Sequence, residues 1–116
     1  MSRLPSEYFK CAALRFYENG DYINAFSRMY YAVFHSMREE LRHAGFSQLK
    51  SHKNVRNAWT ADPEERERIK RMYMLREHVD YMNSGKLFEK TENSMAIFED
   101  MVSFLSQRKI CRQAEL

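Results

Sequence analysis

The sequence predicts an all-α protein, and three observations support this fold class. Its 116 residues include only 3 Gly and 2 Pro, whereas a β-sandwich or barrel needs a tight turn about every ten residues, usually built from Gly, Pro or Asn. Apolar residues recur at spacings of three and four along most of the chain, as they do on the buried face of a helix. Eight Met, eight Phe and seven Tyr supply large side chains that suit a core between helices.

The first predicted helix covers residues 6–18 and ends at Asn19-Gly20, a stop signal for helices. Asp21 follows at once and can cap the next helix. Because the connection is so short, we expect the two helices to lie side by side and antiparallel. The inward side chains of the first helix, at helical spacing, are Phe9, Ala13 and Phe16.

The second helix, predicted over residues 22–43, has three different faces. Large apolar side chains form the first face: Ile23, Phe26, Tyr30, Val33, Phe34, Met37 and Leu41. Smaller side chains on the second face let another helix approach closely: Ala25, Met29, Ala32 and Ser36. Polar side chains form the third face: Asn24, Arg28, Tyr31, His35, Arg38 and Arg42. Since two faces are apolar, the helix is expected to be buried on two sides, and its polar face lines either a groove or a subunit interface.

Residues 41–61 contain no Asp or Glu, and Gly45 ends the preceding helix. Basic residues supply four positive charges in this stretch: Arg42, Lys50, Lys53 and Arg56. The stretch is either a solvated connection or a contact for phosphates or an acidic partner, and the net charge of +3 does not by itself require nucleic acid. Trp59 either covers the end of the bundle or stacks on a base.

Three further helices complete the predicted fold. Ser51 can cap a short helix over residues 51–59, and Asp62-Pro63 is a strong start for a helix over residues 63–82. A last helix is predicted over residues 92–112. Their inward side chains are Ile69, Met72, Leu75, Val79 and Met82, then Met95, Phe98, Met101, Val102, Phe104 and Leu105. The expected architecture is a single domain over residues 1–116, an up-and-down bundle of four long helices and one short helix.

Several classes of protein are excluded by composition. The uncharged runs are short, for example residues 29–37, so no segment is expected to span a membrane. The first ten residues lack the apolar core of a signal peptide, and a cytoplasmic location is therefore expected. Cys11 and Cys111 lie near opposite ends of the chain, neither in a CxxC motif nor beside a His. We therefore expect no disulfide scaffold, no metal ion and no cofactor.

Three motifs resemble those of HEPN domains, small helical bundles of prokaryotic toxin–antitoxin and defence systems. The stretch DYINAFSRMYYAVFHSMREEL is similar to the signature helix of that family, through Asp21-Tyr22, Arg28, Tyr30-Tyr31-Ala32 and Phe34-His35. Ser51-His52-Lys53 resembles the start of the family's short middle helix. Arg76 and Asp80-Tyr81, followed by a last helix with Phe98 and Phe104, are the third match. The three matches come in the family's order and cover about residues 6–109.

The resemblance implies one of two activities. Many HEPN domains are metal-independent ribonucleases that use an Arg followed after four to six residues by a His, paired across a dimer. In that chemistry the His moves the proton and the Arg stabilises the charged transition state. Other members lack the motif and bind nucleotides or partner proteins, often beside a small nucleotidyltransferase.

The ribonuclease motif is imperfect in this chain. The place that corresponds to it is Arg76-Glu77, but Tyr81 stands five residues after Arg76 where a His is expected. Three pairs nevertheless fit the loose spacing, and one of them is Arg38 with His43. The two others span two helical turns. Each of those pairs lies seven residues apart on one helix face, about 10 Å along the axis. As catalytic candidates in the ribonuclease hypothesis they are Arg28 with His35, and Arg71 with His78.

The preferred hypothesis is a binding module for a nucleotide or RNA, forming a homodimer or pairing with a nucleotidyltransferase. The resemblance and the polar face of the second helix give its ligand-binding candidates: Arg28, Tyr31, His35, Lys53, Arg56, Arg76, Asp80 and Tyr81. Two structural interpretations stay open beside it. Arg28 could pair with Asp80 or another buried acid, and His35 could be packed under a neighbouring helix. A third hypothesis is a non-catalytic module for protein–protein interaction.

Overall fold

A computed structural model describes residues 5–47, 49–59, 62–82 and 92–115, with side chains for all of these except residues 81–82 and 108–115. The described residues form five α-helices and no strand, which confirms the all-α prediction. The helices are α1 (Pro5–Glu18), α2 (Tyr22–His43), α3 (His52–Trp59), α4 (Pro63–Met82) and α5 (Glu92–Glu115). The predicted bounds agree to within one residue, except that α5 continues three residues past its predicted end at residue 112.

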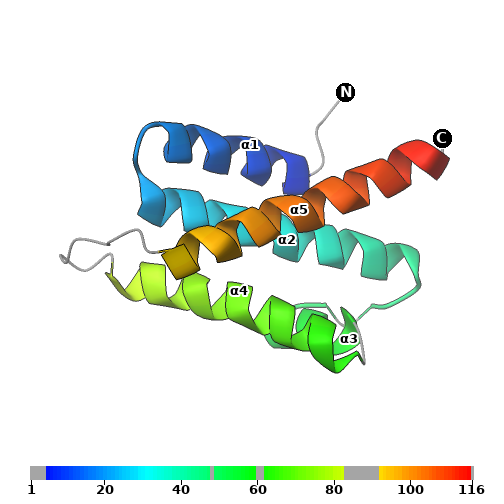
Figure 1. Cartoon of the computed structure of the whole chain (residues 1–116). Coiled ribbons are helices and arrows are strands. Elements are labelled where there is room, and N and C mark those ends of the chain that lie inside the picture. The colour runs from blue at the N-terminus through cyan, green and yellow to red at the C-terminus, as the bar shows by residue number, and fades with distance from the viewer. Residues whose placement is uncertain (1–4, 48, 60–61, 83–91, 116) are drawn as a thin grey trace.

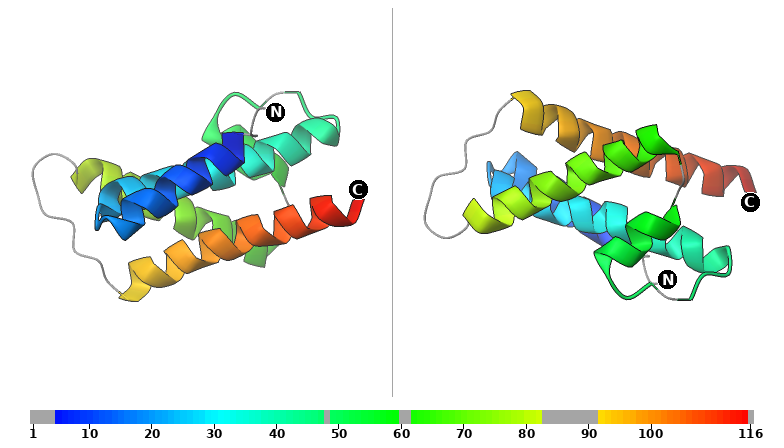
Figure 2. Two further views of the ribbon diagram at one scale, coloured as in Figure 1. Left: turned by 90° about the horizontal axis from the view of Figure 1, so that it is seen from above. Right: turned by 90° about the horizontal axis from the view of Figure 1, so that it is seen from below.

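Helix α2 lies at the centre of the bundle and packs against each of the other four helices. Helices α1 and α2 run antiparallel, with α5 across them and α4 on the other side of α2 (Figure 1). The views from above and below show the short α3 beside the second half of α2 (Figure 2). Helix α2 therefore presents one face to α1 and another face to α3 and α4.

The connections begin and end where the local signals indicate. Gly20 ends α1 with a φ of 78°, and Gly45 follows α2 with a φ of 98°, the left-handed conformation that Gly adopts at low cost. The side chains of Asp21, Ser51 and Asp62 each accept a hydrogen bond from a backbone N–H two or three residues later, at 3.3, 3.0 and 3.1 Å. The predicted helix caps are thus present. The predicted stop at Gly85 lies outside the described residues.

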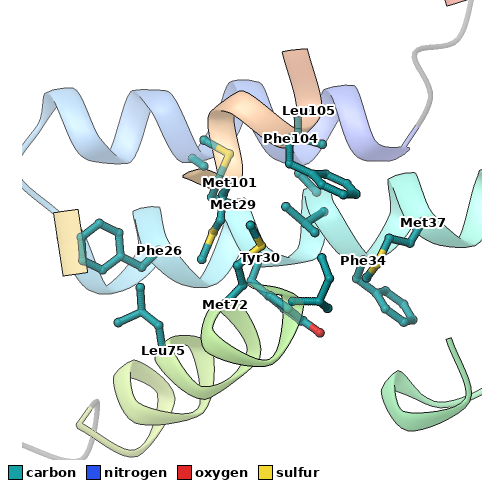
Figure 3. Close-up of a cluster of buried hydrophobic side chains, with 14 of the residues drawn as sticks. Phe26, Met29, Tyr30, Phe34, Met37, Met72, Leu75, Met101, Phe104 and Leu105 are labelled. Carbon is teal, nitrogen blue, oxygen red and sulfur yellow. The ribbon is translucent and has the colours of Figure 1, made fainter. Parts of the chain in front are cut away.

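Both apolar faces of α2 contribute to the core, as predicted. Tyr30 and Phe26 are fully buried among methionines of α2, α4 and α5 (Figure 3). Of the predicted inward side chains, five are only partly buried: Phe9, Phe16, Ile23, Met95 and Val102. The side chain of Met82 is outside the described residues. Trp59 is half-buried with its ring 5.7 Å from that of Phe104, so it covers one end of the core.

An ion pair joins α4 to α5. Arg68 Nε donates to both carboxylate oxygens of Asp100 at 3.0 Å, and the guanidinium lies over the Phe104 ring. The pair shields the edge of the core where the two helices meet. Within the described part of the chain, no helix is long and apolar enough to cross a membrane.

Candidate functional site

The polar face of α2 meets α4 through one direct contact between Tyr31 and Arg76. Arg76 Nη2 donates a hydrogen bond of 2.8 Å to the Tyr31 hydroxyl, and the guanidinium carbon lies 5.2 Å from the centre of the Tyr31 ring. Asp80, one turn further along α4, places its Oδ2 2.9 Å from Arg76 Nε. Tyr31, Arg76 and Asp80, three of the predicted ligand-binding residues, are therefore in contact with one another. The guanidinium is held in one orientation by both neighbours.

The first residue of α3, His52, lies within a ring of aromatic side chains from α2 and α4. Its imidazole centre is 4.2 Å from the ring of Phe34, 5.6 Å from that of Tyr30 and 5.9 Å from that of Tyr73. It also approaches the Tyr31 ring edge-on at 6.1 Å. The contacts fix α3 against the other two helices.

Arg56, one turn after His52, covers Tyr73. Its guanidinium carbon lies 4.2 Å from the centre of the Tyr73 ring, a distance at which a cation is attracted to the π-face. Two guanidinium groups therefore each lie over a tyrosine ring, and both of these tyrosines also contact the imidazole of His52. We call this set of half-buried side chains the tyrosine–arginine cluster: Tyr31, His52, Arg56, Tyr73 and Arg76.

Several polar atoms in and beside the cluster are buried with no hydrogen-bond partner among the described residues. They are Nδ1 of His52, Nε of Arg56 and the hydroxyl of Tyr30. Nε of Arg76 is compensated by the Asp80 carboxylate 2.9 Å away. A buried polar group without a partner costs roughly 1–3 kcal/mol. Most such groups in proteins are satisfied by protein or by ordered water, so these atoms have hydrogen-bonding capacity that the described side chains do not use.

The electrostatic environment favours a neutral imidazole at His52. Burial lowers the pKa of His52 below its usual 6.5, and the charges of Arg76, Arg56 and His35 lower it further. A neutral imidazole offers one donor and one acceptor nitrogen. Burial also raises the pKa of the Tyr30 hydroxyl far above its usual range. Tyr30 is thus a neutral donor beside the cluster.

His35 lies one turn after Tyr31 on α2, where α1 covers it. The ring of Phe9 stacks on the imidazole with centres 5.2 Å apart and planes 2° apart, and the same ring is 5.7 Å from Tyr31. Burial lowers the pKa of His35, with a further contribution from Arg38. His35 is packed beneath a neighbouring helix and borders the cluster.

The other candidates predicted from the sequence lie apart from this contact. Arg28 is half-buried earlier on α2, and Asp80 forms its ion pair with Arg76 rather than with Arg28. Lys53 is exposed on α3. The side chain of Tyr81 lies outside the described residues.

Arg71 and His78 are exposed on α4. At about 100° of helix rotation per residue they point nearly opposite to Asp80. The seven-residue spacing of this pair thus places both side chains on the outer face of α4, away from the tyrosine–arginine cluster.

Two residues of the cluster were not among the predicted site residues. His52 belongs to the Ser51-His52-Lys53 motif, and this signal could have nominated it. Tyr73 follows the buried Met72 on α4, and no pattern in the sequence distinguishes it from a packing residue. Its position becomes informative only when α3 is placed against α4.

The cluster has the chemistry of an anion and nucleobase site rather than of a metal centre. Guanidinium groups form paired hydrogen bonds with phosphate, and aromatic rings stack on bases. In the part of the chain that the structure describes, no three His, Cys, Asp or Glu residues are grouped so that they could hold a metal ion.

Comparison of the chain with protein-family models, with curated proteins and with solved structures gave no match.

Proposed function

We propose that this chain binds a phosphate-bearing ligand, a nucleotide or a segment of RNA, at the tyrosine–arginine cluster. One observation carries the proposal: two guanidinium groups lie over tyrosine rings that contact His52, whose Nδ1 is buried with no partner among the described residues. A bound phosphoryl group would accept hydrogen bonds from the guanidinium groups of Arg56 and Arg76.

The arrangement supports binding because the groups are already oriented. Tyr31 and Asp80 hold Arg76 from two sides, so little side-chain entropy would be lost when a phosphate binds. Asp80 offsets part of the charge of Arg76, and Arg56 supplies the second positive charge.

The proposal extends to the protein's biological context through the HEPN resemblance. As a HEPN-type module the chain would act in a toxin–antitoxin or defence operon, as a homodimer or beside a small nucleotidyltransferase. A homodimer could bring two clusters to one ligand. These assignments rest on the Asp21-Tyr22, Tyr30-Tyr31-Ala32 and Arg76 motifs.

The direct test is calorimetric titration of the protein with adenosine 5′-monophosphate and with a short single-stranded RNA. We expect Arg76→Gln to weaken binding by tenfold or more, because a hydrogen bond to a charged group contributes about 1.5–3 kcal/mol. Arg76→Lys should recover only part of the affinity, since Lys keeps the charge but loses the planar pair of donors.

The matched control is Arg15→Gln, which makes the same charge change on the exposed surface of α1. It should leave the affinity unchanged, and thermal melting would show that each variant is folded. Equal affinities of the wild-type protein and Arg76→Gln would contradict the proposal, as would the absence of binding to both ligands. The latter result would favour the protein–protein interaction module.

A second candidate function is metal-independent RNA cleavage, and the lowered pKa of His52 favours it. A neutral imidazole beside two guanidinium groups can accept the 2′-hydroxyl proton while the cations stabilise the phosphorane. The catalytic pairs expected from the sequence were instead Arg28 with His35 and Arg71 with His78. The test is to incubate RNA in EDTA with the wild-type protein and with alanine variants of His52, His35 and His78. Loss of cleavage in one variant assigns catalysis to that His, whereas no cleavage by the wild-type protein indicates binding alone.

A further inference from the structure

A pocket of about 140 Å³ lies between α3 and α4, next to the tyrosine–arginine cluster. Three of its lining side chains are basic, and none is acidic. Trp59 and Ile69 form an apolar wall. The pocket, which we call the α3–α4 pocket, is lined by Arg56, Asn57, Trp59, Arg66, Ile69 and Lys70.

The size of the α3–α4 pocket limits what it can hold. A cavity needs about 10–15 Å³ of space open to a water-sized sphere to hold one water molecule, so 140 Å³ is ample for one tetrahedral oxyanion such as a phosphoryl group. Pockets for whole drug-sized ligands begin at about 300 Å³. The pocket therefore suits one charged group of a larger molecule. We expect this group to be an anion, because Arg56, Arg66 and Lys70 are positively charged.

The α3–α4 pocket is continuous with the cluster. Arg56 belongs to both, because it lines the pocket and also lies 4.2 Å from the centre of the Tyr73 ring. On α4 the residues of the two sites follow one another at spacings of three and four, from Arg66 and Lys70 to Tyr73 and Arg76, and lie within an arc of about 120° around the helix. A single ligand lying along this face would contact both sites.

The separation of the two sites selects the kind of ligand. Lys70 and Arg76 are six residues apart on α4, about 9 Å along the helix axis. The two phosphoryl groups of pyrophosphate share an oxygen atom and are too close together to occupy both sites. Phosphoryl groups on the 3′ and 5′ oxygens of a ribose are separated by the sugar and can reach both.

We propose that the α3–α4 pocket is a second phosphoryl subsite, so that the ligand carries two phosphoryl groups joined through a ribose. A nucleoside 3′,5′-bisphosphate has this chemistry, and so does a stretch of an RNA strand. The inference rests on the proposed function, because the first phosphoryl group occupies the tyrosine–arginine cluster.

The test compares adenosine 3′,5′-bisphosphate, adenosine 5′-monophosphate and sodium pyrophosphate by calorimetry. In the wild-type protein the bisphosphate should bind at least tenfold more tightly than either of the others. Arg66→Gln and Lys70→Gln should remove most of this advantage and leave the affinity for the monophosphate within about twofold. Both side chains are exposed, so the variants should fold, which thermal melting checks. Arg15→Gln on α1 should keep the full advantage.

A spectroscopic signal reports directly on the α3–α4 pocket. The chain contains 1 Trp, Trp59, which lines the pocket. Its fluorescence should change when the wild-type protein is saturated with the bisphosphate, and change less with Lys70→Gln. A bisphosphate that binds no more tightly than the monophosphate, or an advantage that survives in both variants, would overturn the second subsite.

The outcomes separate this inference from the proposed function. Monophosphate binding that depends on Arg76, without any bisphosphate advantage, would overturn only the second subsite. No binding of the monophosphate, or binding indifferent to Arg76→Gln, would overturn the proposed function. A four-nucleotide RNA identifies the source of the phosphoryl groups: tighter binding than the bisphosphate, weakened by Arg66→Gln, assigns the site to a strand, and equal binding assigns it to a free nucleotide.

Discussion

At the scale of single residues, His52 is the side chain at the centre of the proposed site. It contacts aromatic rings from α2 and α4, and its Nδ1 is buried without a partner in the described structure. A core residue chosen for packing alone would avoid such an unsatisfied nitrogen, because an apolar side chain of similar shape has no such cost. The free-energy cost of burying His52 Nδ1 without a hydrogen-bond partner is consistent with a role for His52 in ligand binding.

The lowered pKa of His52 makes the stability of the fold depend on pH. Burial and the nearby Arg76 and Arg56 lower this pKa from 6.5, so the unfolded chain takes up a proton more readily than the folded chain. Stability should therefore be full above about pH 6.5 and should fall as the pH drops from there to the folded-state pKa. The urea midpoint should be lower at pH 5.5 than at pH 7.5.

Replacing His52 shows how much of the pH dependence of stability comes from this residue. His52→Gln should reduce the difference between the two midpoints, while His35, whose pKa is also lowered by burial, retains its own contribution. The control is His43→Gln, an exposed residue at the end of α2. If the difference between the urea midpoints at pH 5.5 and pH 7.5 is the same in His52→Gln as in the wild-type protein, His52 has the same pKa in the folded and unfolded chains.

At the scale of the elements, helix ends were predicted well because their signals are local. Gly20 and Gly45 adopt positive φ where the sequence predicts helix ends, and Asp21, Ser51 and Asp62 accept the capping hydrogen bonds expected of them. The end of α5 was predicted too early. Residues 113–115 are Gln-Ala-Glu, which favour a helix and contain no stop signal.

The cap of α2 has a measurable contribution because this helix supports all the others. The Asp21 carboxylate accepts the Asn24 N–H at 3.3 Å and the Asn24 side-chain amide at 2.7 Å. Asp21→Ala should lower the free energy of unfolding by about 0.5–2 kcal/mol, as measured by urea denaturation. Glu18→Ala, an exposed change at the end of α1, should alter it by less than about 0.5 kcal/mol. Equal effects would show that the cap contributes nothing.

The candidate site was predicted only in part, because it is assembled between elements. The polar face of α2 was visible from spacing, and the HEPN resemblance nominated Tyr31, Arg76 and Asp80, which the fold brings together. Periodicity reports which residues share a helix face, not which faces meet. Tyr73 is therefore visible only once α3 and α4 are placed beside each other.

At the scale of the whole molecule, the bundle positions groups that are distant in the sequence. Tyr31 and Arg76 are 45 positions apart and in hydrogen-bond contact. The central α2 makes this possible, because it contacts α1 on one side and α3 and α4 on another. The core of Phe26, Tyr30 and the buried methionines holds these helices in place (Figure 3). The site is thus a property of the packing of three helices.

The central claim is that a phosphate-bearing ligand binds beside His52, and imidazole NMR tests it most directly. Spectra of ¹⁵N-labelled protein would be followed from pH 5 to 8 with and without adenosine 5′-monophosphate at saturation. The exposed His43 and His78 serve as internal references. We predict that the His52 resonances shift and that the pKa of His52 rises, because a bound anion favours the imidazolium. A saturated protein whose His52 resonances and pKa are unchanged would contradict the claim.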